Sequence, residues 1–279
     1  MNESLSFMCD KASFAVASIK DDTHSFIAYY DDTMLEAAIK YKTIVDEFDD
    51  AIKAGEFKMY LQPQISAKTR RLTGAEALVR RIKPDGTIIS PIDFIPVYEK
   101  SGLISRLDRY IWEQAAAKLG EWKKAGINMS ISVNISPKDF YYIDIFNTFA
   151  GLIKKYDIEP SNLKIEITET TIMSDVPNLM GELEELRKAG FTLEMDDFGS
   201  GYSSLNTLKD INVDVLKVDM GFIKETKNVK KSRIILASVI KMAKELNLLI
   251  ITEGVETEEQ VDNLTKLGCD VFQGYYFSK

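Results

Sequence analysis

Histidine is nearly absent from this chain, because only His24 stands among 279 residues. Histidine-rich zinc sites, the HExxH motif and Ser-His-Asp catalysis all need histidines that the chain lacks. The two cysteines, Cys9 and Cys269, lie far apart without CxxC spacing, which indicates free thiols in a reducing cytoplasm. Any metal site must therefore use oxygens of Asp, Glu and Asn, which favour hard cations such as Mg²⁺ or Mn²⁺.

Long apolar runs and an excess of basic residues are also missing. No window approaches about 18 uninterrupted apolar residues, so no membrane-spanning helix and no membrane contact are expected. The N-terminus lacks a basic region followed by an apolar one and predicts no secretory signal. The net charge of −8 argues against binding duplex nucleic acid, which needs a basic face. A small phosphate substrate stays compatible if cations supply positive charge.

Short β-rich runs alternate with amphipathic helical segments from about residue 57 onward. Eight such runs predict an α/β fold, a TIM-type (β/α)8 barrel, with an open doubly wound sheet as the alternative. The alternative is weaker, because the Gly-Ser-Gly turn after the fifth run lacks the third glycine of a dinucleotide fingerprint. Ser90-Pro91 and Ser136-Pro137 predict helix starts. The runs span residues 58–63, 73–80, 129–136, 163–169, 191–197, 214–219, 248–253 and 270–276.

The N-terminal region follows a different pattern. Apolar residues from Met34 to Ile52 recur every three or four positions and predict one helix over 33–54. This helix is expected either to dock on the barrel or to join domains or subunits. Residues 25–32 predict a lone strand. We therefore divide the chain into an N-terminal strand and helix extension, residues 1–46, and a barrel domain, residues 47–279.

Polar side chains lie in the C-terminal half of all eight predicted strands, where barrels of this kind carry their chemistry. Carboxylates crowded in a barrel mouth repel one another unless cations or protons neutralise them. Two cations about 3.5–4 Å apart can clamp a phosphodiester and activate a bridging water, so the pattern favours a two-metal site. The strand-end residues are Gln62, Glu76 with Arg80, Asn134, Glu166 with Glu169, Asp196 with Asp197, Lys217 with Asp219, Glu253 and Gln273.

Some roles follow from geometry and chemistry. Adjacent Asp196 and Asp197 would point opposite ways in a regular strand, so they serve one centre only where the strand ends and the backbone turns. Asp196 is the natural bridge between two cations. Lys217 is suited to position or deprotonate the water. Arg80 can make a bidentate hydrogen bond to a phosphate group.

These motifs resemble, in order and content, the EAL-domain family of cyclic diguanylate (c-di-GMP) phosphodiesterases. Glu76-Ala77-Leu78 stands inside GAEALVR, and the resemblance covers about residues 47–279. It implies a barrel variant with one antiparallel strand. It also implies metal-dependent hydrolysis of c-di-GMP to linear pGpG with two Mg²⁺ or Mn²⁺ ions, inhibited by the larger Ca²⁺. The other matching stretches are YLQP, SPIDFIP, SVNIS, IEITET, DDFGSGYSSL, LKVD, TEGVET, EEQ and QGYYFSK.

Position by position, the resemblance implies a role for each of these residues. The implied ligands of one metal are Glu76, Asn134, Glu166 and Asp196. The implied ligands of the second are Asp196 and Asp197. Contacts to the nucleophilic water are implied for Lys217, as candidate base, and Glu253. Contacts to substrate, or to the metals through water, are implied for Gln62, Arg80, Asp219 and Gln273. The implied supporting residues are Glu169, which braces the loop, Glu256, and the loop residues Gly199, Ser200 and Gly201.

Two positions depart from the family pattern: Arg81 stands where tryptophan is common, and Ser200 where threonine is usual. Residues 8–32 resemble the tail of a GGDEF domain without its signature. We therefore expect a piece of a longer multidomain protein, with no cyclase activity in this chain. The resemblance further implies a homodimer.

The main alternative is a receptor that binds c-di-GMP without hydrolysing it. Family members of that kind typically lose a metal ligand, the lysine or the loop, and this sequence keeps all of them. An unrelated sugar-phosphate barrel enzyme would make the motif order a coincidence. Glu76→Ala should abolish turnover with little effect on folding, because a carboxylate at the barrel rim contributes little stability.

Overall fold

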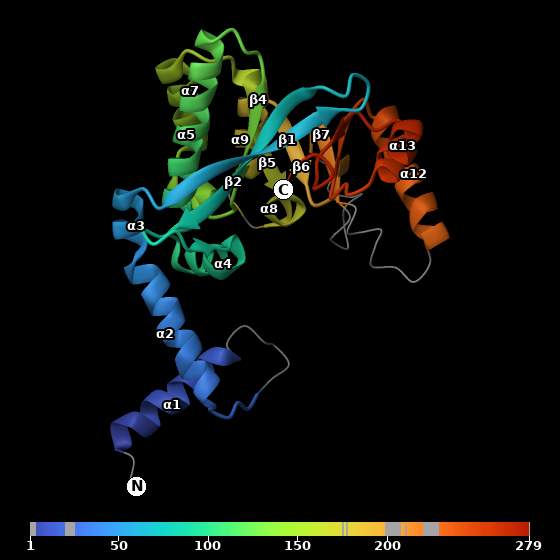
Figure 1. Ribbon diagram of the computed structural model, residues 1–279. Helices are drawn as coiled ribbons and strands as arrows, with labels where there is room; N and C mark the ends of the chain where they lie inside the picture. The colour runs from blue at the N-terminus through green and yellow to red at the C-terminus, as the bar shows by residue number, and fades with distance from the viewer. Residues whose placement is uncertain are drawn as a thin grey trace.

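The computed structural model describes residues 4–19, 26–174, 176, 178–198, 208–209, 211–219 and 229–278. Eight strands form a closed barrel in the order β1-β9-β8-β7-β6-β5-β4-β2, because β1 also pairs with β2, and the short β3 adds to the edge of β2. Helices surround this barrel, which confirms the predicted TIM-type fold (Figure 1). The strands are β1 Phe57–Ser66, β2 Leu72–Ile82, β3 Ile88–Ile89, β4 Ser130–Ile135, β5 Leu163–Thr168, β6 Leu193–Asp196, β7 Val215–Asp219, β8 Leu249–Glu253 and β9 Val271–Phe272.

One barrel strand runs against the others. β1 is antiparallel to both β2 and β9, and the other neighbours in the ring are parallel. A short turn is enough to join antiparallel strands, whereas parallel strands need a crossover. Gln62 consequently lies in mid-strand, directly opposite Glu76. The antiparallel strand that the resemblance implies is therefore confirmed.

The helices bury apolar stripes on the outer face of the barrel. In α5, Ile104–Lys124, the buried residues recur every three or four positions, as an amphipathic helix requires. Ser90 and Pro91 start α4 as predicted. The predicted start at Ser136-Pro137 is wrong: Pro137 lies in a turn, and α6 begins at Asp139, whose carboxylate accepts the Ser136 N–H. The barrel helices are α4 Pro91–Ser101, α5, α6 Asp139–Tyr142, α7 Ile145–Tyr156, the 3-10 helix η1 Pro160–Asn162, α8 Glu169–Met173, α9 Leu179–Lys188, α12 Val229–Glu245 and α13 Glu258–Leu267.

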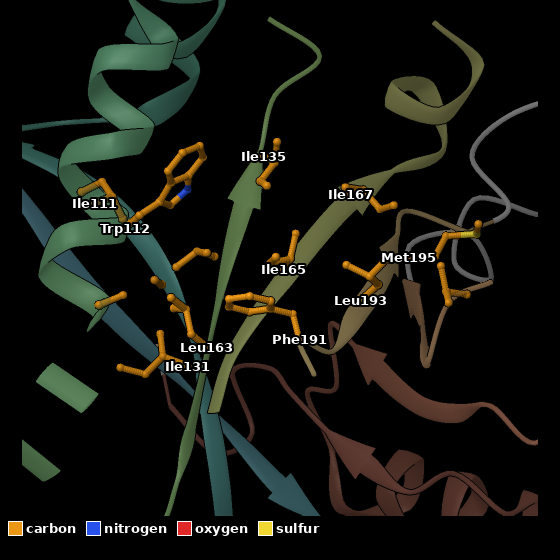
Figure 2. Packing of buried hydrophobic residues seen from close by; sticks show 14 of the residues in the cluster. Ile111, Trp112, Ile131, Ile135, Leu163, Ile165, Ile167, Phe191, Leu193 and Met195 are labelled. Carbon is orange, nitrogen blue, oxygen red and sulfur yellow. The ribbon is translucent and has the colours of Figure 1, made fainter. Parts of the chain in front are cut away.

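The hydrophobic core lies between the strands and these helices. Ile165 and Leu193 are fully buried in it together with Trp112 of α5 (Figure 2). Because successive side chains of a strand point to opposite faces, their neighbours Glu166 and Glu194 face the barrel interior. The interior of the barrel is therefore rich in polar and charged groups, and the outer layer supplies the apolar packing.

The N-terminal extension differs from both of its predictions. Residues 26–31 form no strand, and Phe26 is 90% exposed. None of the described strands pairs with this segment. The predicted helix over 33–54 is broken at Glu47 into α2, Asp32–Asp46, and α3, Phe48–Ala54. Phe48 of α3 packs into the core, whereas α2 buries no residue and projects from the barrel beside α1, Leu5–Ser18 (Figure 1). Docking on the barrel thus holds for α3 and for part of α2, since Ile44 packs against the core and Lys40 donates to Asp93 of α4 at 2.8 Å.

Within the part of the chain that the structure describes, no helix is both long enough and apolar enough to cross a bilayer.

Candidate active site

Lys217 lies in the barrel mouth among carboxylates from four other strands. Its side chain is 1% exposed, and its nitrogen lies 3.2 Å from Glu76 Oε2 and 2.5 Å from Glu166 Oε2. The same nitrogen lies 3.3 Å from Asp196 Oδ1 and 2.7 Å from Glu253 Oε1. Strands β2, β5, β6, β7 and β8 therefore bring five of the predicted strand-end residues to one point.

Glu76 is buried in this group. Gln273 Nε2 donates to its Oε2 at 2.5 Å, and Asn134 Nδ2 donates to its Oε1 at 3.4 Å. The expected rim position is wrong, because β2 directs this side chain into the barrel, where it is 6% exposed. The effect of Glu76→Ala on folding stays a prediction. Burial acts to raise the Glu76 pKa, but Lys217 and these hydrogen bonds outweigh burial and hold the pKa below its usual value.

For the other three carboxyls around Lys217, the net effect is a raised pKa. Burial first, and then the charge of Glu76, raise the pKa of Glu166 well above its usual value. Burial also raises the pKa of Asp196, and it raises the pKa of Glu253 to about 8. For Lys217, burial lowers the pKa, but the four carboxylates reverse this and raise it well above the usual value. One ammonium group thus lies among four acidic groups and cannot neutralise the charge of all of them.

A cavity of about 330 Å³ opens beside this group. Gln273 Nε2 donates to Gln62 Oε1 at 2.8 Å, and Gln273 Oε1 accepts from Gln64 Nε2 at 3.2 Å. These amide–amide hydrogen bonds fix the orientation of the Gln273 side chain, and therefore the N–H that it donates to Glu76. Six of the predicted site residues line the cavity together, namely Gln62, Glu76, Asp219, Glu253, Glu256 and Gln273.

A second cavity, of about 270 Å³, lies on the other side of β2 next to Asn134. Arg80 lines it, and Leu78 lines both cavities. The Arg80 guanidinium donates to the Val79 carbonyl at 2.8 Å and lies 5.9 Å from the centre of the Tyr60 ring. The structure thus places Arg80 at this second cavity and not among the hydrogen bonds of the carboxylates around Lys217.

Arg81, the departure from the family pattern, has a different role. It is 2% exposed, and it donates to Glu56 Oε2 at 2.9 Å and to Glu47 Oε2 at 2.7 Å. Glu47 is the residue at which α2 ends and α3 begins. Arg81 therefore ties β2 to the helix junction, on the face of the strand opposite to Arg80.

Part of the predicted site falls outside the described residues, namely Gly199, Ser200 and Gly201. Asp197, close to that gap, has a φ of 55°, and its N–H donates to Asp196 Oδ1 at 2.9 Å. The backbone turns here, as two adjacent aspartates serving one centre would require. Glu169 is buried and begins α8 instead of ending β5, and its bracing of the loop stays a prediction.

The chemistry of these residues suits divalent cations. Glu166 Oε1 is buried with no hydrogen-bond partner among the described residues, and a cation would satisfy such an oxygen. Carboxylate and amide oxygens are the ligands that Mg²⁺ and Mn²⁺ prefer. Over the described ranges, no three His, Cys, Asp or Glu side chains already stand in an arrangement that holds a metal ion, and the Lys217 ammonium lies among the carboxylates. The candidate ligands are Glu76, Asn134, Glu166, Asp196 and Asp197.

Sequence reasoning missed two residues that hold the end of β4. Trp112 Nε1 donates to the carbonyl of Asn134 at 2.9 Å. Asp139 Oδ2 accepts from the Ser136 N–H at 2.8 Å. Both come from helices, so no strand periodicity points to them. Gln64 was also missed, although it shares the inward face of β1 with Gln62.

Comparisons with known proteins agree with this arrangement. The family model described as "EAL domain" matches residues 45–279. Signaling protein YkoW of Bacillus subtilis is 34% identical over 269 residues, which cover 96% of this chain and 34% of that protein. The bifunctional diguanylate cyclase/cyclic di-GMP phosphodiesterase MucR of Pseudomonas aeruginosa is 31% identical over 269 residues, which cover 96% of this chain and 39% of that protein.

Solved structures agree as well. The structure of PaMucR phosphodiesterase in complex with c-di-GMP is 33% identical and has a TM-score of 0.79, over 85% of this chain and 96% of that one. The chain spans less than two fifths of the length of YkoW and MucR. Because the family model covers most of the chain and contains every candidate ligand, the chain belongs to the EAL domain family.

Proposed function

We propose that this chain hydrolyses c-di-GMP to linear pGpG with a water activated by two divalent cations, in bacterial second-messenger signalling. The observation that carries the proposal is the group of four carboxylates around Lys217, two of them buried and two partly buried, beside a cavity lined by Gln62 and Gln273. The similarity to MucR, whose name and solved complex give c-di-GMP as substrate and ligand, supports the choice of substrate.

The side chains of the site would have different roles in the reaction, according to their chemistry. When bound, the cations supply Lewis acidity and lower the pKa of a bound water toward neutrality. Glu76, Asn134, Glu166 and Asp196 would hold one ion, and Asp196 with Asp197 the other. Gln62, Arg80, Asp219 and Gln273 would orient the substrate.

Lys217 and Glu253 would contact the nucleophilic water. The raised pKa keeps Lys217 protonated while four carboxylates surround it. Cations that drew these carboxylates away would lower that pKa, which is what a base at this position needs. Glu253 lies 2.7 Å from the Lys217 nitrogen and would hold the ammonium in place.

The test is a turnover assay. The protein is incubated with c-di-GMP and either Mg²⁺ or Mn²⁺, and pGpG is followed by chromatography. We expect product with both ions and inhibition by Ca²⁺. Binding without turnover in either ion would favour the alternative, a c-di-GMP receptor. Glu76→Gln keeps the side-chain volume and should abolish turnover, and normal turnover in this variant would refute the site.

We further propose the context of the domain. Residues 47–279 form the EAL phosphodiesterase domain, and residues 1–46 form an extension that resembles a GGDEF tail and a linker helix. The relatives are much longer than this chain, which supports a piece of a larger multidomain protein. A homodimer in the cytoplasm is the expected state. Light scattering at several concentrations tests the dimer.

A further inference from the structure

An ion pair lies in the barrel interior beneath the proposed metal ligands. Lys164 Nζ donates to Glu194 Oε1 at 2.8 Å, and the Glu194 side chain is fully buried. Lys164 stands two positions before Glu166 on β5, and Glu194 stands two positions before Asp196 on β6. Because side chains alternate along a strand, all four face the interior, and the pair forms the next layer toward the N-terminal ends of the strands.

This pair is in direct register with the candidate ligands. Glu194 is the neighbour of Glu166 across the β5–β6 ladder, and adjacent strands lie about 4.8 Å apart. Glu194 Oε2 is buried and has no hydrogen-bond partner among the residues described. Lys164 is thus the cation that compensates Glu194 in the described part of the interior.

The pair adds no net charge to the site. With every acidic group ionised, the acidic groups outnumber the ammonium groups by four, whether or not the pair is counted, and four is the charge of two divalent cations. Lys164 cancels Glu194, so Glu194 adds nothing to the charge that those cations must meet. The groups counted are Glu76, Glu166, Glu194, Asp196, Asp197 and Glu253, with Lys164 and Lys217.

We propose that Lys164 and Glu194 are a positioning pair that sets the net charge beneath Glu166 and Asp196, and thereby the affinity of the site for divalent cations. The inference rests on the proposed metal-dependent function. The pair touches neither substrate nor the reacting water. It acts through the two carboxylates that stand above it.

The two members of the pair make opposite predictions. Glu194→Gln leaves the Lys164 ammonium uncompensated next to Glu166, where it competes with a cation, so the Kd for Mn²⁺ should rise about tenfold or more. Lys164→Met leaves Glu194 either ionised, which attracts cations, or protonated, which is neutral. In neither case should Mn²⁺ binding weaken. The double variant Lys164→Met/Glu194→Gln restores a neutral layer, and its Kd should return to within about threefold of wild type.

Calorimetric titration of the metal-free protein with Mn²⁺ gives the readout directly, without reference to activity. Thermal unfolding of each variant in chelator measures its folding separately. Glu113→Gln removes a carboxylate that is paired with Lys155 on the outer surface, and it controls for the change in net charge. Its Kd should equal that of wild type.

Two results would overturn the inference. One is a wild-type Kd in Glu194→Gln. The other is weakened binding in all three variants in proportion to their loss of stability, which a merely structural pair would give. Absence of Mn²⁺ binding by the wild-type protein would instead refute the proposed metal-dependent function, so the two failures are distinguishable.

Discussion

Replacing Lys217 by methionine tests the electrostatic organisation of the site most directly. Methionine has a similar length and volume, so it removes the ammonium without opening a large cavity. Four carboxylate oxygens that lie 2.5 to 3.3 Å from the ammonium nitrogen would then face one another in the barrel interior. Removing one partner of a buried ion pair costs about 3–5 kcal/mol.

The cost should lie toward the lower end of this range, because some of the carboxyls take up protons when the ammonium is lost. The pKa of Glu253 is already about 8. For a domain of this size, about 3 kcal/mol corresponds to a fall in Tm of roughly 6–12 °C. Saturating Mn²⁺ should reverse most of the fall, because cations supply the missing charge and bind only the folded state.

Thermal unfolding of wild type and Lys217→Met in chelator, and then in Mn²⁺, measures both effects. Lys118→Met is the matched control, since Lys118 pairs with Glu121 on the exposed side of α5. Its Tm should stay within about 2 °C of wild type, as expected for a surface ion pair. If Lys217→Met unfolds in chelator at the wild-type temperature, the ammonium does not hold the carboxylates together, and the reasoning above is refuted.

Three other perturbations follow from the structure. In Gly74→Ala the new Cβ would lie 2.5 Å from Ser130 Oγ and 2.9 Å from the Ser130 carbonyl, so urea unfolding should show a loss of about 1–3 kcal/mol. An unchanged urea midpoint would show that β4 moves away from the new Cβ without loss of stability. Burial raises the Asp139 pKa to about 6, above its unfolded value, so the folded state binds more protons and stability falls as pH rises from about 4 to 6. Asp139→Asn should flatten this part of the stability–pH curve, and a slope equal to wild type would contradict the assignment. Arg81→Met leaves two partly exposed carboxylates without their guanidinium, and a loss of about 1–3 kcal/mol is expected. A loss below about 0.5 kcal/mol would show that the junction does not depend on Arg81.

The positions of the strands and the identity of the central carboxylates could be predicted from the sequence. Alternation along a strand assigns Glu166 to the inward face, and Lys217 lies on the sixth predicted strand, residues 214–219, where the structure has β7. The direction of β1 could not be predicted in this way, because a strand has the same period of two in either direction. Only the resemblance implied it.

Partners that meet across long sequence separations could not be predicted. Arg81 reaches Glu47 across 34 positions, and nothing in the spacing identifies one as the partner of the other. Residues 25–32 have the composition of a strand, but a strand also needs a neighbour to pair with, and the described chain offers none there. The burial of Glu76 depends on how the whole barrel closes.

The antiparallel direction of β1 has a consequence for the order of folding. A short turn joins β1 to β2, whereas parallel neighbours such as β4 and β5 can pair only after the helix between them in sequence, here α7, has crossed back. Local pairings close with less loss of chain entropy, so we expect this hairpin in the folding transition state. Gln62 and Glu76 face each other in it. One wall of the site would therefore form before the barrel closes, and mutational φ-values along β1 should exceed those along β7.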